Sequence, residues 1–193
     1  MSREVLSMIQ KMDLNDLDLQ MAMQCAPLFA GLKVSNLLIV DTENRSRVLQ
    51  ILKNSQIAHI TLSEFEGRVT MLLYRNEELR GYFEDQRVKN LLQFLGYENT
   101  SFWQLLMKFR ERFQFYQRES QDFPHEMGLF LGYPVEDVAG FIKNEGKKSL
   151  CTGYWKVYRN PKEKVTLFEQ FEQARERMIQ YIYGGGSICQ IAL

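Results

Sequence analysis

The chain has few of the residues from which metal sites, disulfide frameworks and phosphate loops are made. Its 193 residues include three cysteines, two histidines and four prolines. Cys25, Cys151 and Cys189 are odd in number and widely spaced, and no Cys-x-x-Cys pair is present. This excludes a disulfide framework, a zinc ribbon and a thioredoxin-type motif. The run from Gly184 to Ser187 follows a helical pattern and lacks the Gly-Lys-Ser/Thr ending of a phosphate loop, so we expect it to end that helix.

Excess charge and long apolar runs are also absent. Lys plus Arg equals Asp plus Glu, at 24 each, so the overall attraction that drives binding to nucleic acids or anionic membranes is missing. No apolar run approaches the roughly 20 residues of a membrane-spanning helix. The first residues are too polar for a signal peptide. We therefore expect a cytoplasmic protein without a membrane partner, and the composition argues against a nucleic-acid partner.

The residues that are present are those of a folded globular protein. Hydrophobic residues make up 45% of the chain and charged residues 25%, which is ordinary globular composition. Thirteen phenylalanines indicate a core built on large rings, or a sizeable ligand or partner surface. The length fits one domain. We expect a single domain over residues 1–193, with a loosely held arm at 1–13 and a glycine-rich tail at 184–193.

The spacing of apolar residues predicts a mixture of helices and strands. Alternation with polar residues indicates strands, and a spacing of three or four indicates helices. Strands are predicted at 36–40, 58–62 and 69–74, the last two paired as an antiparallel hairpin across Glu66-Gly67. Helices are predicted to begin at Asn15 or Asp16, Thr42 or Asn44, after Asn76, at Asp85, near Phe102 and at Lys162. This pattern is typical of the α+β class, with several amphipathic helices packed on a small, mainly antiparallel β-sheet.

Residues 122–158 carry an unusual density of glycine, proline and aromatic residues. Asp122 is suited to cap a short helix in which Pro124 occupies the first turn. A tight Gly-Tyr-Pro turn leads into a second helix that begins at Pro134. Gly128 and Gly132, four residues apart, would share a face and let another backbone approach closely.

A strand is predicted at the end of this segment, from Tyr154 to Tyr158. Alternation places Tyr154, Lys156 and Tyr158 on one face and Trp155 and Val157 on the other. The first face could line a pocket in which Lys156 meets an anionic group and the rings stack on a planar ligand. Alternatively, Lys156 is a lysine that lies along apolar surface between two tyrosines at a rim. We expect Trp155 to belong to the core.

The segment also resembles a known family. The run PHEMGLFLGYPxxDVxGFI, followed by GYWKVY, is similar to the signature of a bacterial family catalogued as a domain of unknown function. APLFAGLK at 26–33 and YRNEEL at 74–79 share the likeness, which covers about residue 20 to 183. Met127 stands where the signature has a branched aliphatic residue. The resemblance implies no established activity. It implies a link to redox or iron metabolism, since such genes lie beside flavodoxin genes in anaerobic bacteria.

Three residues are candidates for catalysis. His125 and Glu126 could form an acid–base pair or bind a metal or haem, or the histidine could help to cap a short helix. A zinc protease motif is excluded because Leu129 stands where the second histidine would be, and no metal site is predicted. Cys151 could be a nucleophile with His125 as its base, or simply a small buried apolar residue. We expect His59 to be exposed to solvent.

The leading functional hypothesis is a small-ligand or cofactor-binding protein that could also be an enzyme. Polar and aromatic groups around two glycines and a tight turn suit a pocket with a few convergent polar groups. The pattern leaves the cofactor unidentified. The alternatives are a helix–turn–helix protein that binds DNA through residues 124–145, and a module that docks a redox partner protein. The predicted site comprises His125, Glu126 and Cys151 as catalytic residues and Tyr133, Asp137, Tyr154, Lys156 and Tyr158 as ligand-binding residues.

Overall fold

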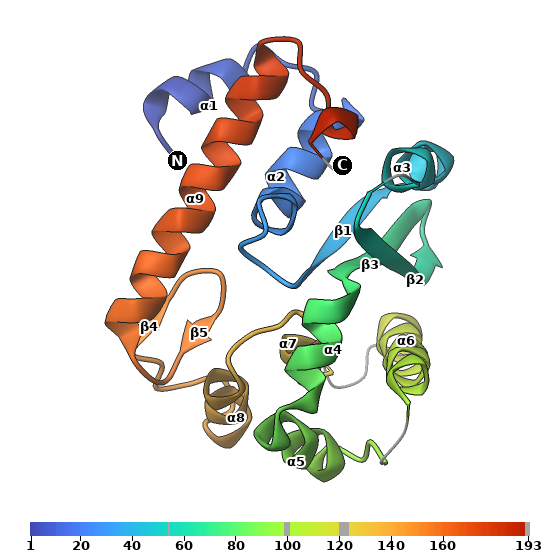
Figure 1. Cartoon of the computed structure of the whole chain (residues 1–193), viewed down its shortest axis with the longest axis vertical. Helices are drawn as coiled ribbons and strands as arrows, with labels where there is room; N and C mark the ends of the chain where they lie inside the picture. The colour runs from blue at the N-terminus through green and yellow to red at the C-terminus, as the bar shows by residue number, and fades with distance from the viewer. Residues whose placement is uncertain (54, 99–100, 120–123, 192–193) are drawn as a thin grey trace. The chain divides into compact units, whose positions relative to one another are not determined.

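The computed structural model describes residues 1–53, 55–98, 101–119 and 124–191. The predicted helix cap Asp122 lies outside these residues. The chain divides into two compact units. Unit 1 comprises Met1–Asn76 and Glu169–Leu193, and unit 2 comprises Glu77–Phe168. Figure 1 shows the helices and strands in chain order. The predicted α+β class is confirmed, because helices predominate and the strands form small antiparallel sheets.

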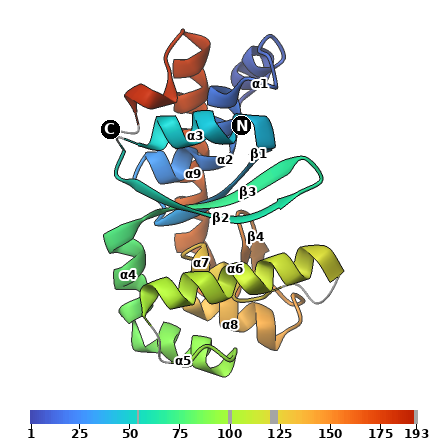
Figure 2. The same ribbon diagram turned by 90° about the vertical axis from the view of Figure 1, so that its right-hand side faces the viewer.

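Unit 1 is built on a three-stranded antiparallel sheet. Its strands are β1 (Ser35–Asp41), β2 (Ile57–Phe65) and β3 (Arg68–Arg75), in the order β1-β3-β2. The β2–β3 hairpin turns at Glu66-Gly67, as predicted, and both residues have positive φ angles. A bulge between Thr61 and Ser63 shifts the register of β2 against β3. Figure 2 shows the three strands as one twisted sheet.

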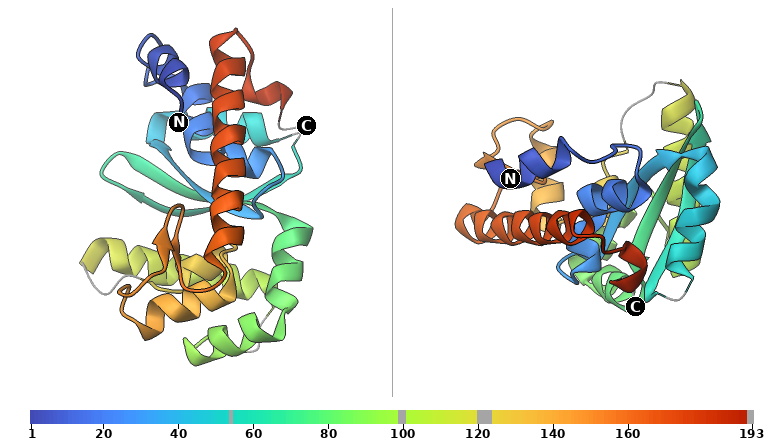
Figure 3. Two further views of the ribbon diagram at one scale, coloured as in Figure 1. Left: turned by 90° about the vertical axis from the view of Figure 1, so that its left-hand side faces the viewer. Right: turned by 90° about the horizontal axis from the view of Figure 1, so that it is seen from above.

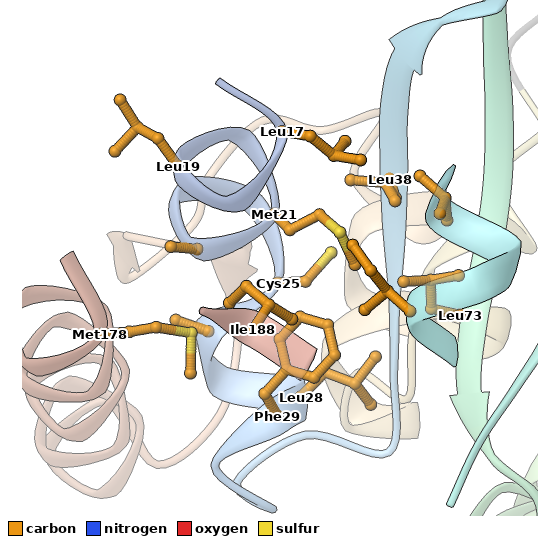
Figure 4. Close-up of a cluster of buried hydrophobic side chains, with 14 of the residues drawn as sticks. Leu17, Leu19, Met21, Cys25, Leu28, Phe29, Leu38, Leu73, Met178 and Ile188 are labelled. Carbon is orange, nitrogen blue, oxygen red and sulfur yellow. The ribbon is translucent and has the colours of Figure 1, made fainter. Parts of the chain in front are cut away.

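The helices of unit 1 pack on one face of this sheet. They are α1 (Arg3–Ile9), α2 (Leu17–Phe29), α3 (Arg45–Leu52) and the 3₁₀ helices η1 (Thr42–Asn44) and η2 (Ile188–Gln190). In Figure 4, Met21 and Cys25 of α2 lie in the same cluster as Leu38 of β1, Leu73 of β3 and Ile188 of η2. Burial of these apolar side chains supplies most of the favourable free energy of folding.

Both ends of the chain contribute to this core. Within the segment predicted as a loose arm, α1 is capped by Ser2, whose side chain accepts from the Val5 amide, and Val5 is fully buried. Within the predicted tail, Ser187 and Gln190 form a capping box around η2, and Ile188 is fully buried. Ile9, Met12 and Ile191 pack against the same core, so apolar contacts attach both segments to it.

Unit 2 is mostly helical. Its helices are α4 (Asn76–Glu84), α5 (Gln86–Phe94), α6 (Phe102–Glu119), α7 (Met127–Phe130) and α8 (Val135–Lys143), and the first residue of α4 belongs to unit 1. Two short strands, β4 (Cys151–Thr152) and β5 (Lys156–Val157), form an antiparallel hairpin of two residues each. Its core centres on Phe130 of α7, which stacks on Phe109 of α6 with ring centroids 4.1 Å apart. The ring centroid of Phe83 of α4 lies 5.1 Å from that of Phe130. The aromatic core therefore holds the short helix α7 against longer ones.

Helix α9 (Pro161–Tyr183) runs continuously through both units (Figure 3). The spacing of apolar residues predicts a buried stripe on this helix that runs from Val165 through Phe168 to Ile182. The stripe is correct for Phe171, Ala174, Met178 and Ile182, which are all buried. The stripe is wrong at its start, since Val165 is 42% exposed and the neighbouring Lys164 is buried instead. Lys164 Nζ lies 3.8 Å from Glu136 Oε1 of α8, so an ionic contact replaces the apolar contact expected there.

Proline ordinarily ends a helix, so the sequence predicts that the helix before Pro27 stops near Ala26. Helix α2 does not stop at Ala26 but continues through Pro27 to Phe29. Proline in the last turn removes only one helical hydrogen bond, and Gly31, with a φ of 72°, provides the stop. His59 is exposed, as predicted.

No helix in the described part of the chain combines the length and the apolar character needed to cross a membrane.

Candidate functional site

A cavity of about 370 Å³ lies in unit 2, between the α7–α8 turn and the β4–β5 hairpin. Apolar side chains make up much of its wall, including Met127, Leu131 and Val138. Five of the eight predicted site residues also line it: His125, Tyr133, Asp137, Tyr154 and Lys156. The structure thus gathers residues from both halves of the 122–158 segment around one space.

Two glycines shape the α7 side of the cavity. A Cβ atom on Gly128 would lie 2.8 Å from Val138 Cγ2, so only glycine allows α8 to pack this closely against α7. Gly132 has a φ of 67°, which ends α7 and lets the Tyr133 amide donate to the Gly128 carbonyl at 2.9 Å. Pro134 then begins α8. The prediction that these glycines permit a close approach holds for Gly128, whereas Gly132 serves the turn.

Asp137 fastens the hairpin to α8. Its carboxylate is buried, with Oδ2 accepting from Trp155 Nε1 at 2.8 Å. Oδ1 accepts from the backbone amides of Tyr158 at 2.7 Å and Arg159 at 3.2 Å. These three donors offset the cost of burying the charge. The predicted ligand-binding residue Asp137 therefore lines the cavity but uses both oxygens to position other residues.

The predicted strand from Tyr154 to Tyr158 is wrong in its extent. Only Lys156 and Val157 form a strand, because the chain bends at Gly153, whose amide donates to the Trp155 carbonyl. The bend breaks the expected alternation, and Tyr154, Trp155 and Lys156 all line the cavity. Gly153 packs against the Phe168 ring, which leaves no room for a side chain at the bend.

Tyr158 does not line the cavity, contrary to the prediction. Its side chain packs on α8 at Gly140, where an added Cβ would lie 2.5 Å from Tyr158 Cβ and Cγ. The amide of Tyr158 is held by Asp137, which directs the chain across this glycine. Tyr158 therefore contributes to packing between the hairpin and α8.

Aromatic rings form a braced wall of the cavity. Trp155, expected in the core, is half-buried, and its ring stacks on Tyr133 at 4.7 Å between centroids. Trp155 and Phe168 also pack edge to face, with their ring centroids 4.6 Å apart. The Tyr133 hydroxyl donates to the Tyr154 carbonyl at 3.4 Å, and burial raises the pKa of Tyr133 to about 12. Tyr133 therefore stays neutral at physiological pH.

Two nitrogen-bearing side chains lie beside one ring of the cavity wall. The exposed His125 has its ring centroid 5.5 Å from that of Phe141. Lys156 Nζ lies 5.8 Å from the same Phe141 centroid and donates to the Gly146 carbonyl at 2.7 Å. A lysine over an aromatic face gains a modest cation–π attraction. The helical spacing of the sequence favours a buried position for Phe141 in the second helix of the segment, and it gives no sign that this ring forms part of the cavity wall.

Glu126 does not share the cavity with His125. Its buried Oε1 accepts from the Tyr97 hydroxyl at 3.1 Å and lies 3.1 Å from Arg112 Nε of α6. Arg112 also donates to the Leu95 carbonyl, at the end of α5. The two consecutive residues proposed as an acid–base pair therefore lie in different surroundings: His125 lines the cavity, and Glu126 ties α7 to α6.

Cys151 is half-buried in β4 and pairs with Val157 across the hairpin. It is not among the residues that line the cavity, although Thr152 and Gly153 are. Among the residues that the structure describes, no group of three or more His, Cys, Asp or Glu side chains could hold a metal ion. The cavity presents hydrogen-bonding, cationic and aromatic groups.

Comparison with known families gives one match. A family model described as "Protein of unknown function (DUF3793)" matches residues 21–192. The chain belongs to this family. The match spans the whole cavity-forming segment, including α7, α8 and the hairpin. No curated protein and no solved structure matches the chain.

Proposed function

We propose that this DUF3793 member is a bacterial cytoplasmic protein that binds a small organic ligand in the cavity between α7, α8 and the hairpin. Five of the residues singled out in its motif line that one cavity, and this observation supports the proposal most directly. Ligand pockets of roughly 300–1,000 Å³ commonly have apolar walls with a few placed polar groups. The cavity, at about 370 Å³, has this composition and would hold one small ligand.

The rigidity of the walls is a second reason for this proposal. Asp137 holds Trp155 and the hairpin backbone, and Tyr133 stacks on Trp155. A pre-organised pocket binds ligand without the entropic cost of ordering its side chains.

The geometry gives less support to DNA binding. The first helix of the expected helix–turn–helix, α7, has a single turn of four residues. At the start of α8, where base contacts would be expected, Glu136 lies near Lys164 and Asp137 is buried. Two acidic residues at this position would also repel the phosphate backbone.

Tryptophan provides a direct test of ligand binding. The chain has two tryptophans, and Trp155 lines the cavity whereas Trp103 lies on α6. The variant Trp103→Phe leaves Trp155 as the single indole. We expect members of a small-molecule fragment library to shift the ¹⁵N–¹H resonance of this indole in a saturable manner. If no fragment does so, the cavity is not a ligand site.

A blocking variant adds a control. Thr152→Phe places a ring at the exposed, cavity-lining position 152, and Thr166→Phe places the same ring on an exposed turn of α9 outside the cavity. Fragments that bind the cavity should lose affinity in the Thr152→Phe protein and keep it in the Thr166→Phe protein. Equal affinity in both variants would place the binding elsewhere.

A further inference from the structure

The charged residues of the cavity differ in how far their charge is already compensated. Asp137 is the one acidic side chain among the described residues that line the cavity, and its two carboxylate oxygens accept hydrogen bonds from three donors. Lys156 is exposed, and its ammonium donates to one neutral acceptor, the Gly146 carbonyl. An ammonium group has three N–H donors. Lys156 can therefore donate to a ligand while it keeps this bond.

Lys156 is also held beside the aromatic wall. Its Nζ lies over Phe141, whose ring also contacts His125, so a cationic and an imidazole group converge on one ring. Within the described part of the chain, Lys156 forms no ion pair, in contrast to Lys164 and Lys147. An anionic group bound next to Phe141 would gain a charge-assisted hydrogen bond without displacing an existing carboxylate.

The part of the wall formed by Tyr133, Tyr154 and Trp155 suits a flat ring. Tyr133, Tyr154 and Trp155 all line the cavity, and Trp155 is braced by Asp137, Tyr133 and Phe168. Aromatic pairs in offset or edge-to-face geometry gain about 0.5–1.5 kcal/mol beyond the burial of their area. A planar ring would therefore bind more tightly than a puckered ring of similar size.

From these contacts we propose that the ligand is a planar aromatic acid. Its ring packs against the Tyr133–Trp155 wall, and its carboxylate accepts from Lys156 Nζ, with His125 beside it. This inference rests on the proposed function and names the ligand class for the same cavity. The specificity determinant is Lys156, because it is the cavity residue whose charge is not already paired within the described chain.

Three matched probes separate the two features of the ligand. 2-Naphthoate is planar and anionic, 2-naphthamide is planar and neutral, and decahydro-2-naphthoate is anionic and puckered. Isothermal titration calorimetry on the full chain measures each affinity. We expect 2-naphthoate to bind about tenfold or more tightly than either of the others, the loss expected for one charge-assisted hydrogen bond or one aromatic contact.

Two lysine variants assign the charge selectivity. Lys156→Met keeps an apolar stem of similar length and removes the ammonium, whereas Lys162→Met removes an exposed ammonium outside the cavity. We expect Lys156→Met to bind 2-naphthoate about tenfold more weakly, with its affinity for 2-naphthamide unchanged. Lys162→Met should bind both probes as the parent does. Thermal melting of each variant verifies folding.

The outcomes separate this inference from the proposed function. If the acid and the amide bind with equal affinity, or if both lysine variants weaken the acid equally, the anionic class is wrong while ligand binding stands. If none of the three probes binds, the aromatic acid class is overturned, and the fragment screen on Trp155 still decides whether the cavity takes another ligand. If fragments also fail to bind, the proposed function is overturned with it.

Discussion

Asp137 is the residue on which the cavity depends most. It joins the first turn of α8 to a hairpin some twenty residues further along the chain, through the Trp155 indole and the amides of Tyr158 and Arg159. All three partners are donors, so the group at this position must accept on both oxygens. A neutral amide cannot, because its nitrogen would face a donor.

The substitution Asp137→Asn should therefore destabilise the protein although it conserves shape. We expect the free energy of unfolding to fall by about 2–3 kcal/mol, the cost of losing a charge-assisted hydrogen bond and leaving a buried donor unpaired. Urea denaturation followed by tryptophan fluorescence measures this. Glu145→Gln, at an exposed carboxylate that forms a surface ion pair with Lys147, should change the stability little. A loss under about 0.5 kcal/mol at Asp137 would contradict this role.

Cys25 provides a prediction on pH. Its thiol is fully buried in unit 1, and burial raises its pKa to about 12. In the unfolded chain the thiol ionises near its ordinary value of 9.0. The neutral Cys25 thiol therefore makes its full contribution to the free energy of unfolding below about pH 9. This contribution is lost as the pH rises towards 12, because the thiol loses its proton in the unfolded state at a lower pH than in the folded state.

Compared with Cys25→Ala, the wild-type protein should lose about 1.4 kcal/mol of its stability advantage between pH 8 and pH 10. Urea denaturation at several pH values measures the difference. Burial lowers the pKa of Lys33 to about 8, which changes the stability in the opposite direction in both proteins, apart from its electrostatic interaction with Cys25. Cys189→Ala, at an exposed thiol, is the control for the loss of a cysteine side chain. If the stability difference between the wild-type protein and Cys25→Ala were the same at every pH, the raised pKa of Cys25 would be contradicted.

The polar and aromatic residues of the site could be predicted from the sequence, because their types and clustering are visible in the chain. His125, Tyr133, Tyr154 and Lys156 were found in this way and do line one cavity. The direction of Glu126 could not be predicted, since its partner Arg112 is fourteen positions earlier in the sequence and on another helix. Pairings of that kind depend on tertiary packing.

At the scale of elements, glycines set how closely the hairpin and α8 can approach. Gly140 lies in the interior of α8, where alanine would ordinarily favour the helix by about 0.5–1 kcal/mol. Here the Tyr158 side chain occupies the space that a Cβ would need. Gly81 occupies a comparable position in α4, but with nothing within 4 Å of an added Cβ.

The two glycines should therefore respond in opposite directions to alanine. Gly140→Ala should lower the free energy of unfolding by about 1–3 kcal/mol through overpacking against Tyr158. Gly81→Ala should raise it by about 0.5–1 kcal/mol through the helix propensity of alanine. Chemical denaturation of both variants gives the comparison. Stabilisation by both substitutions would show that Tyr158 moves aside without cost.

Helices and the β2–β3 hairpin were predictable because their periodicity is local. The short strand at 156–157 was not, because the bend at Gly153 depends on the distant ring of Phe168. The start of α9 was mispredicted for a related reason. Lys164 and not Val165 is buried there, since Glu136 of α8 supplies a partner that the periodicity of α9 alone does not reveal.

At the scale of the whole molecule, α9 links the two units covalently. Residues 161–168 of this helix belong to unit 2, and residues 169–183 belong to unit 1. Both tryptophans lie in unit 2. Tryptophan emission therefore reports on unit 2, whereas a substitution in the core of unit 1 acts at a place without tryptophan.

Because helix formation is cooperative, loss of unit 1 should destabilise the continuous helix and hence unit 2. Ile188→Ala removes a fully buried side chain from unit 1 and should cost about 2–5 kcal/mol. We expect the urea midpoint measured by tryptophan emission to fall as well. Cys189→Ala, one residue away and exposed, should leave it unchanged. An unchanged midpoint in Ile188→Ala would show that the units unfold independently.

The division of the chain also sets an order of synthesis. Unit 2 is one uninterrupted stretch, whereas unit 1 is made of residues before and after it. On the ribosome, the sheet of unit 1 emerges first but must wait for Met178, Ile182 and Ile188 to complete its core. Unit 2 can fold during that wait. The earliest-made part of the nascent chain is therefore the last to be finished, and its exposed strands are the segment most in need of protection by chaperones.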